Sequence, residues 1–442
     1  MQEAPIRLIG RWHELSPSER YALCDRGLDQ IFDPEMAEQV RQLFADVRAN
    51  GDDALVRALD VFDGCKVPAE RLRVGEDEFA QARKQVPSEL VAAVRDAIDH
   101  VRRFNEQLTA RGDWDFESEP GLRVGEKVTP IESAGLFVPS GKGSYPSVLV
   151  QLGTPAVVAG VRQVAVVVPP VPGSDGKVDP AVLLVADELG ISEVFRSNGP
   201  AGVAALTFGT ETVPKVRKVV GPGSPAVTFA QVEAQRYGTV SVMLLGPSES
   251  LVIADDSADP RLLAADLLNE AEHGADSASL LVTDSEALLS AAQAEVARQL
   301  GALPEPRRSY AAAALGQNGG AVLVRDMAEA AEVANQYAPE HMQVAVSDPD
   351  TLVAMLYNAG EILVGQWSPI SAANFLIGCP ASLPTSGFAK VNGGVTAEAF
   401  RKRTAVARVD EHALTRMRAS IRALARHEGF PAHEAAVEAR FA

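Results

Sequence analysis

Cysteine is scarce in this sequence. The 442 residues include three cysteines, Cys24, Cys65 and Cys379, and none lies in a CxxC pair. This argues against a zinc ribbon and a disulfide framework, and it fits a reducing compartment. The opening residues, MQEAPIRLIGRWHE, lack a basic flank followed by an apolar segment, so no signal peptide is expected. No apolar run reaches about 18 residues, so we expect no transmembrane helix and a cytoplasmic location.

Positive charge is also in short supply. The formal net charge is -18 at pH 7, which argues against nucleic-acid binding and against binding to anionic membranes. The remaining composition is typical of a globular protein, with 46% apolar and 23% charged residues. The length predicts two or three domains.

The order of predicted elements indicates an α/β fold. Residues 1–130 read as mostly helical, with apolar residues three or four apart. Two blocks in which strands alternate with helices follow, at 131–247 and 248–390, and this alternation predicts parallel sheets. A tail, 391–442, ends in a helix.

Two short segments could form a catalytic or metal site. Glu270 and His273 in EAEH share one helix face and could bind a divalent ion, although a solvated helix end is the simpler interpretation. Glu340 and His341 follow Pro339 on a turn that opens a strand, where an imidazole could serve as a general base. A capped helix end would explain this pair equally well. His433, close to Glu428, lies in the tail, where histidines are usually exposed.

No standard nucleotide-binding fingerprint is present, since neither GxGxxG nor GxxxxGK[ST] occurs. Two glycine-rich stretches, 135–147 and 220–228, could cradle phosphate at a helix start. They could equally be turns between strands and helices.

Taken in order, several segments resemble the histidinol dehydrogenase family. They run from about residue 123 to 390, and the tail segment PAHEAAV extends the resemblance. Among them, APEH, GPSESLVIAD and LPTSG are the most specific.

The resemblance implies two incomplete Rossmann-like domains with a helical N-terminal region and a small tail domain. The first would comprise 1–130 with 248–390, and the second 131–247. The tail, 391–442, would be swapped onto the partner subunit of a homodimer. Family members oxidise an alcohol through an aldehyde to an acid with two NAD molecules, and zinc positions the substrate.

Site residues carry over by motif. His341 resembles the base that takes the alcohol proton, and Glu340 resembles the group that activates water for the second oxidation. The metal ligands would be Glu270, His273, Asn374 and His433. The substrate-binding positions would be Ser248, Glu428 and Ala381. The cofactor-binding positions would be Phe137, Ala201 and Ser224.

The chain departs from the family pattern at six of these positions. Glu270 replaces a glutamine and Asn374 replaces an aspartate, so the predicted metal site keeps one carboxylate and one amide. Ala381 replaces a histidine that faces the substrate. On the cofactor side, Phe137 replaces a tyrosine, Ala201 a glutamine and Ser224 an asparagine.

These departures shape the predicted function. Loss of a polar group at Ala381 favours a small polar alcohol other than L-histidinol, because such groups discriminate between substrates. The sequence therefore predicts an NAD-dependent, zinc-assisted dehydrogenase of a small polar alcohol. Two alternatives stay open: a true L-histidinol dehydrogenase, and a diverged homologue without dehydrogenase activity.

Overall fold

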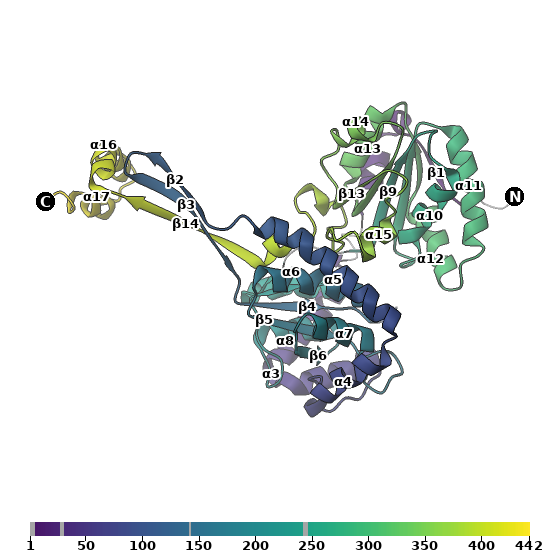
Figure 1. The fold of residues 1–442 in the computed structure, drawn as a ribbon, viewed down its shortest axis with the longest axis horizontal. Helices are drawn as coiled ribbons and strands as arrows, with labels where there is room; N and C mark the ends of the chain where they lie inside the picture. Colours follow the sequence, from purple (N-terminus) through teal and green to yellow (C-terminus); the bar gives the residue numbers. More distant parts are fainter. Residues whose placement is uncertain (1–4, 27–30, 141–142, 242–245) are drawn as a thin grey trace.

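A computed structural model describes residues 5–26, 31–140, 143–241 and 246–442. It has two lobes and a long arm that carries the C-terminus (Figure 1). Parts of two sequence predictions lie outside the described residues: Gly141 and Lys142 of the glycine-rich stretch 135–147, and 242–245 of an expected strand.

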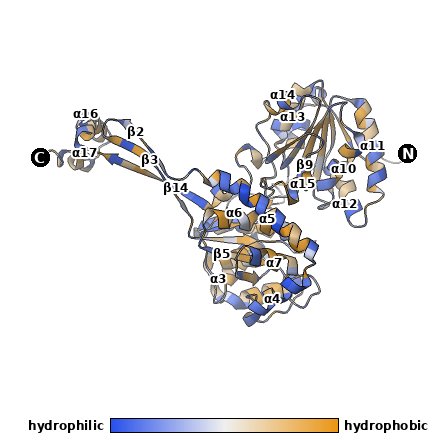
Figure 2. Ribbon diagram, in the orientation of Figure 1, coloured by the Kyte–Doolittle hydropathy of each residue, from blue (hydrophilic) through white to orange (hydrophobic). Residues whose placement is uncertain are grey.

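One lobe is built on a six-stranded parallel sheet. Counted from β9, its strands follow the order 3-2-1-4-5, and β1 from the N-terminal segment extends the sheet beside the third strand. In sheet order the strands are β1 (Leu8–Arg11), β11 (Gly320–Leu323), β10 (Ala278–Thr283), β9 (Glu249–Ala254), β12 (His341–Ala345) and β13 (Glu361–Val364). The central strands are almost entirely buried, as expected where helices cover both faces. Figure 2 shows these strands largely in the hydrophobic colours.

Helices cover both faces of this sheet. Alternate residues of β9 divide between two hydrophobic clusters: Val252 packs with α10 and α11, and Leu251 packs with α13 and α14. Aspartate or serine side chains cap the first turns of α10, α11, α13 and α14, which explains where these helices begin. The helices are α1 (Pro17–Cys24), α10 (Pro260–Ala271), α11 (Glu286–Leu300), α12 (Arg307–Ala313), α13 (Met327–Tyr337), α14 (Pro349–Val353) and α15 (Ile370–Phe375), with short turns η1 (Trp12–Glu14) and η4 (Ala314–Asn318).

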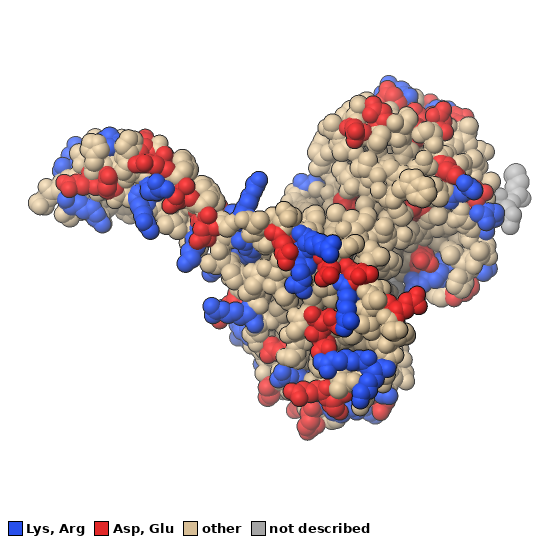
Figure 3. Space-filling model, viewed as in Figure 1, with Lys and Arg blue, Asp and Glu red and all other residues tan. Residues whose placement is uncertain are grey.

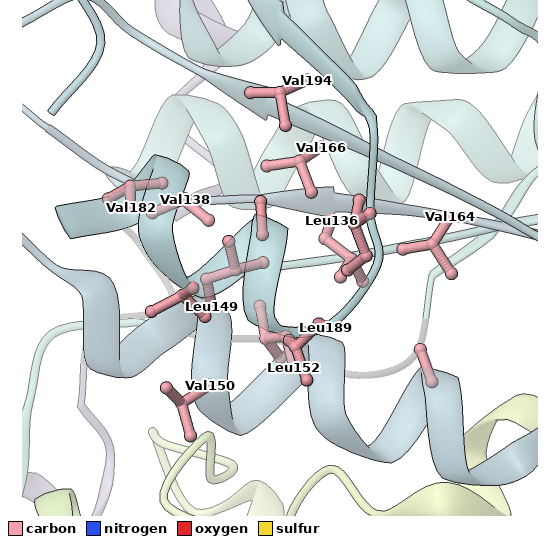
Figure 4. Close-up of a cluster of buried hydrophobic side chains, with 14 of the residues drawn as sticks. Leu136, Val138, Leu149, Val150, Leu152, Val164, Val166, Val182, Leu189 and Val194 are labelled. Carbon is pink, nitrogen blue, oxygen red and sulfur yellow. The ribbon is translucent and has the colours of Figure 1, made fainter. Parts of the chain in front are cut away.

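The other lobe is built on a five-stranded parallel sheet, again in the order 3-2-1-4-5 when counted from β4. Its strands are β4 (Ser133–Phe137), β5 (Gln163–Val168), β6 (Glu193–Arg196), β7 (Lys218–Val220) and β8 (Val240–Ser241). Its helices are α6 (Pro146–Ala159), α7 (Pro180–Glu188), α8 (Gly199–Phe208) and α9 (Pro225–Ala234), followed by η3 (Gln235–Tyr237). Each of these four helices has proline in its first turn, where the missing N–H costs nothing. Figure 4 shows the apolar packing between the sheet and α6 and α7.

The N-terminal helices pack on this second lobe. Phe44 and Leu55 of the first helix join the cluster of α8 and α9, and Val94 and Ile98 of the last join the cluster of α6 and α7. The helices are α3 (Pro34–Asp63), which bends at Gly51, α4 (Glu76–Gln85) and α5 (Ser88–Thr109), with η2 (Ala69–Arg71) between the first two. This differs from the expected grouping of 1–130 with 248–390, because the buried apolar residues of these helices pack in the two clusters of the 131–247 sheet. Among described elements before residue 130, the other lobe receives β1, η1 and α1.

The arm is a three-stranded antiparallel sheet that ends in two helices. Its strands are β2 (Trp114–Glu119), β3 (Leu122–Pro130) and β14 (Arg401–Val409), in the order β14-β3-β2. The helices at its end are α16 (Glu411–His427) and α17 (Pro431–Glu438). The expected helical region therefore ends before β2, where the apolar residues Trp114 and Phe116 alternate with polar ones as in a strand.

The expected tail, 391–442, divides into two parts. Residues up to Phe400, including η6 (Ala397–Phe400), pack on α5 and α6, and the arm begins at β14. The turn η5 (Phe388–Lys390) precedes them.

The predicted α/β class with parallel sheets is confirmed. The shared strand order matches five of the six strands of the doubly wound dinucleotide fold. Among the described residues, no helix is long and apolar enough to cross a membrane.

Candidate active site

The predicted site lies at the amino edge of the six-stranded sheet. The neighbouring strands β9, β12 and β13 begin there with Glu249, His341 and Glu361. The crossover helix α10 returns from the opposite edge and brings Glu270 and His273 to the same place. Open α/β sheets usually bind ligands outside their carboxyl ends, so this site uses the opposite edge.

Glu270 is the centre of a polar cluster that the sequence predicts only in part. Its Oε1 accepts hydrogen bonds from Asn374 Nδ2 at 2.7 Å and from Asn269 Nδ2 at 2.8 Å. Its Oε2 pairs with His273 Nδ1 at 2.9 Å. Burial raises the pKa of Glu270, but the charges of His273 and His341 and the hydrogen bonds outweigh it and lower the pKa to about 2. Glu270 is therefore ionised although it is buried.

His273 follows α10 and lies at the edge of the cluster, with a side chain that is 38% exposed. Burial lowers the pKa of His273, whereas the charge of Glu270 and its hydrogen bond raise it, and the pKa reaches about 9. Without a bound cation, His273 is protonated at neutral pH.

His341 is buried among three carboxyl groups. Its Nδ1 lies 2.5 Å from Glu361 Oε1, while its Nε2 lies 3.8 Å from Glu340 Oε1 and 4.0 Å from Glu270 Oε2. The first distance is a hydrogen bond and the other two are too long for one. Burial lowers the pKa of His341, but Glu270, Glu340 and Glu361 together raise it to about 10.

Glu340 faces the same space. Its Oε2 accepts the backbone N–H of Glu249 at 3.1 Å. Burial and the charges of Glu270 and Glu249 raise the pKa of Glu340 to about 8, against the opposing charge of His341. Strongly shifted carboxyl and imidazole groups that face one another are typical of catalytic sites.

The predicted substrate positions divide between the lobes and the arm. Ser248 directly precedes β9 at the same edge as Glu340. Ala381 lies in a segment that meets the other lobe, and its N–H donates to Gln151 Oε1 of α6 at 3.2 Å. Glu428, by contrast, is exposed just after α16.

The predicted fourth metal ligand also lies on the arm. His433 is exposed in α17, where its ring lies 4.9 Å from that of Phe430. Figure 1 places α16 and α17 at the far end of the arm, away from α10 and α15. One chain therefore brings together Glu270, His273, Asn374, Glu340 and His341, but not Glu428 or His433.

Comparison with known proteins decides the family. The model of the histidinol dehydrogenase family matches residues 29–441. A histidinol dehydrogenase from Synechocystis sp. is 41% identical over 401 residues, which cover 90% of this chain and 92% of that one. The histidinol dehydrogenase homolog 2 from Mesorhizobium japonicum is 40% identical over 401 residues, covering 90% of each chain. The chain belongs to the histidinol dehydrogenase family.

Solved structures agree. The crystal structure of histidinol dehydrogenase from Elizabethkingia anophelis matches with a TM-score of 0.94 at 31% identity, over 100% of this chain and 99% of that one. The predicted family is thereby confirmed, and the chain is a member of an oxidoreductase family.

Zinc is expected for a histidinol dehydrogenase, and the residues at Glu270 fit a divalent cation chemically. They offer a carboxylate oxygen, an imidazole nitrogen and an amide oxygen from Asn374. The 2.9 Å between Glu270 Oε2 and His273 Nδ1 is close to the spacing of two ligand atoms that each lie about 2 Å from one ion. Within the described ranges, no three His, Cys, Asp or Glu side chains form a metal cluster. Glu270 and His273 would therefore need Asn374 and one further residue from elsewhere to complete the ligand set.

NAD is the second group expected for a histidinol dehydrogenase, and the predicted positions lie at the carboxyl edge of the five-stranded sheet. The strand order reverses there between β4 and β7, the usual place for a dinucleotide. Ser224 is exposed before α9, and its side chain does not cap the helix. Gly221 comes so close to β4 that a Cβ would lie 2.2 Å from the Phe137 carbonyl oxygen. An uncapped helix start after close-packed glycines fits a pyrophosphate group.

Two of the predicted cofactor positions are core residues. Phe137 is 3% exposed and Ala201 is fully buried, and both belong to the cluster of α3, α8 and α9. The predicted roles of all the site residues stay predictions.

The sequence analysis missed two carboxylates of this histidinol dehydrogenase family member. Glu361 opens β13 and binds His341, and Glu249 opens β9. Arg26 donates to Glu249 Oε2 at 2.6 Å, and the backbone N–H of Ser386 donates to its Oε1. A charged residue at the start of an otherwise apolar strand was the available signal in both ESLVIA and EILV.

Proposed function

We propose that this chain oxidises L-histidinol with NAD. Support comes from relatives that carry the name histidinol dehydrogenase and match nearly the whole chain. The observation that carries the chemistry is the buried imidazole of His341. Its Nδ1 is held by Glu361, and its Nε2 makes no hydrogen bond with the two nearest carboxyl groups.

The chain's own groups have distinct tasks in this proposal. The neutral ring of His341 accepts the alcohol proton at Nε2, and the ionised Glu340 takes a proton from water when the aldehyde is oxidised further. Glu270, His273 and Asn374 would hold a divalent ion, which would supply Lewis-acid polarisation of the substrate. NAD, when bound, accepts the hydride. Burial of Glu340 and His341 keeps bulk water away from the reacting atoms.

A second candidate substrate is the one that the sequence analysis predicts, a small polar alcohol other than L-histidinol. Ala381 favours it, because a methyl group offers no hydrogen bond where family members have an imidazole. A pocket that has lost such a group discriminates less strongly for its original ligand.

The proposed assembly is a homodimer in which each tail reaches the partner's site. His433 and Glu428 are exposed at the end of an arm whose strand β2 is exposed along its whole length. The segment 401–442 carries nine Lys and Arg against five Asp and Glu, although the whole chain is acidic. Figure 3 shows basic and acidic side chains side by side on the arm, as on the lobes.

Apolar exposure beside the metal position supports this assembly. Phe375 and Leu376, which follow Asn374, are 56% and 43% exposed, and Trp367, earlier in the same stretch of sequence, is 95% exposed. Exposed apolar side chains that adjoin one another, as Phe375 and Leu376 do, are typical of interaction sites.

The test is NADH formation by purified protein supplied with zinc. L-histidinol is compared with small polar alcohols that carry amino, sulfonate or carboxylate groups, and His341→Asn is the control for each. The highest kcat/KM for L-histidinol supports the first candidate, and a higher value for another alcohol supports the second. No turnover of any alcohol would contradict both and favour a homologue without dehydrogenase activity.

A further inference from the structure

The geometry points to Glu361 as the positioning residue of His341: its carboxylate fixes the tautomer and orientation of the imidazole that accepts the alcohol proton. This inference rests on the proposed function, in which His341 is the base. Neither the sequence patterns nor the family motifs assigned a role to Glu361.

Strand pairing places the two side chains together. His341 and Glu361 are the first residues of β12 and β13, and they are direct partners in the parallel register. Residues paired in this way project from the same face of a sheet at a spacing of about 4.8 Å. The register thus brings the two side chains within reach of each other, and His341 Nδ1 lies 2.5 Å from Glu361 Oε1.

The hydrogen bond selects one form of the ring. Only the neutral imidazole can accept a proton, and it has one donor and one acceptor nitrogen; in that form, donation from Nδ1 to Glu361 leaves Nε2 as the acceptor. Nε2 is directed toward Glu340 and Glu270 without a hydrogen bond to either, at 3.8 and 4.0 Å. This is the arrangement that a general base needs.

A purely structural role explains Glu361 less well. The residue is only 9% exposed, and its Oε2 has no hydrogen-bond partner among the described residues. Leaving a buried carboxylate oxygen unsatisfied destabilises the folded state, whereas an apolar residue at this strand position would not. A buried polar atom left unpaired calls for an explanation, and a catalytic role is one of those known.

Three substitutions test the role by kinetics. Glu361→Ala should lower kcat about a hundredfold or more and change KM less than about threefold, because the substrate does not contact Glu361 in this proposal. Glu361→Gln keeps the size of the side chain but loses its charge, and its kcat should also fall at least about tenfold. Glu361→Asp keeps the charge and should recover at least about tenfold of the loss seen with alanine.

Glu329→Gln is the matched control. Glu329 is also a buried carboxylate beside a histidine, 3.7 Å from His13 Nδ1, but it lies in the first turn of α13, which Asp326 caps, at the carboxyl edge of the sheet and not at the amino edge where His341 lies. The kcat of the Glu329→Gln variant should stay at the wild-type value. If Glu361→Gln and Glu361→Ala stay within about threefold of wild-type kcat, or raise KM alone, the positioning role is overturned.

A second readout does not need turnover. Nuclear magnetic resonance of protein with 15N-labelled histidine should show a His341 ring with hydrogen on Nδ1, and a low-field proton signal that Glu361→Gln abolishes and Glu329→Gln keeps. Hydrogen on Nε2 alone, or a signal unchanged in Glu361→Gln, would overturn the inference. A protein that oxidises no alcohol but shows the expected signals would contradict the proposed function and leave the His341–Glu361 pairing established.

Discussion

Asn374 Nδ2 donates a hydrogen bond to Glu270 Oε1 at 2.7 Å, and this contact joins the two predicted metal-ligand positions at which the sequence departs from the family motifs. The resemblance implies an amide at the first position and a carboxylate at the second in the family, and this chain has them reversed. Because the two side chains touch, the exchange moves one charge within a single site and keeps the total.

The contact predicts strong coupling between the two positions. Glu270→Gln alone removes the carboxylate from the cation site and should weaken zinc binding at least about tenfold. The double variant Glu270→Gln with Asn374→Asp restores one carboxylate and one amide, so binding should return to within about threefold of wild type. Calorimetric zinc titration of the single and double variants measures this coupling, and additive losses would contradict it.

Zinc affinity should rise with pH. The pKa of His273 is raised to about 9 by the neighbouring Glu270, so a cation that binds its nitrogen must displace a proton at neutral pH. Apparent affinity should therefore increase about tenfold per pH unit between about pH 7 and 9 and level off above that range. Competition with a chelator of known affinity measures the slope. His273→Gln should bind more weakly and with a smaller slope, and a flat profile in the wild type would exclude His273 as a ligand.

Mixing two inactive variants should restore activity if the tail acts in the partner's site. In the proposed dimer each site takes His341 from one chain and His433 from the other. A dimer of one His341→Asn chain and one His433→Asn chain therefore has one site with neither change and one site with both. Co-expression in equal amounts should give about a quarter of wild-type activity, since half of randomly assembled dimers are mixed. No recovery in mixed dimers isolated with two affinity tags would show that His433 serves its own chain or none.

Asp266 predicts a pH-dependent stability that is separate from catalysis. Burial raises its pKa from 3.8 to about 6, against a side-chain hydrogen bond from Gln343. A raised carboxyl pKa means that the folded state binds more protons than the unfolded state between about pH 4 and 6, so the contribution of Asp266 to stability falls as pH rises through that range. Asp266→Asn removes this titration and should gain about 2 kcal/mol relative to wild type between pH 4 and pH 8. Urea unfolding at both pH values measures the difference, and a pH-independent difference would contradict the assignment.

Local patterns in the sequence predicted much of the fold and part of the site. The alternation of strands and helices from 131 to 390 gave the parallel sheets, and the motifs around Glu270 and His341 identified two groups that do meet. Both results depend on residues close together in the sequence.

Features that depend on long-range pairing were out of reach. The proximity of His341 to Glu361 follows from the β12–β13 register, which no local pattern specifies. The N-terminal helices expose apolar faces that could cover either sheet, so their packing on 131–247 was not predictable from periodicity. The hairpin at 114–130 was missed because β14, its partner, comes almost 300 residues later.

The position of β13 has a consequence for how the protein loses activity. It is the outermost strand of its sheet, paired on one side by β12, and it carries the carboxylate that holds the base. Terminal strands fray more readily than central ones, because fewer contacts must break. Mild denaturant should thus release the imidazole while both lobes are still folded, and inactivation would precede unfolding.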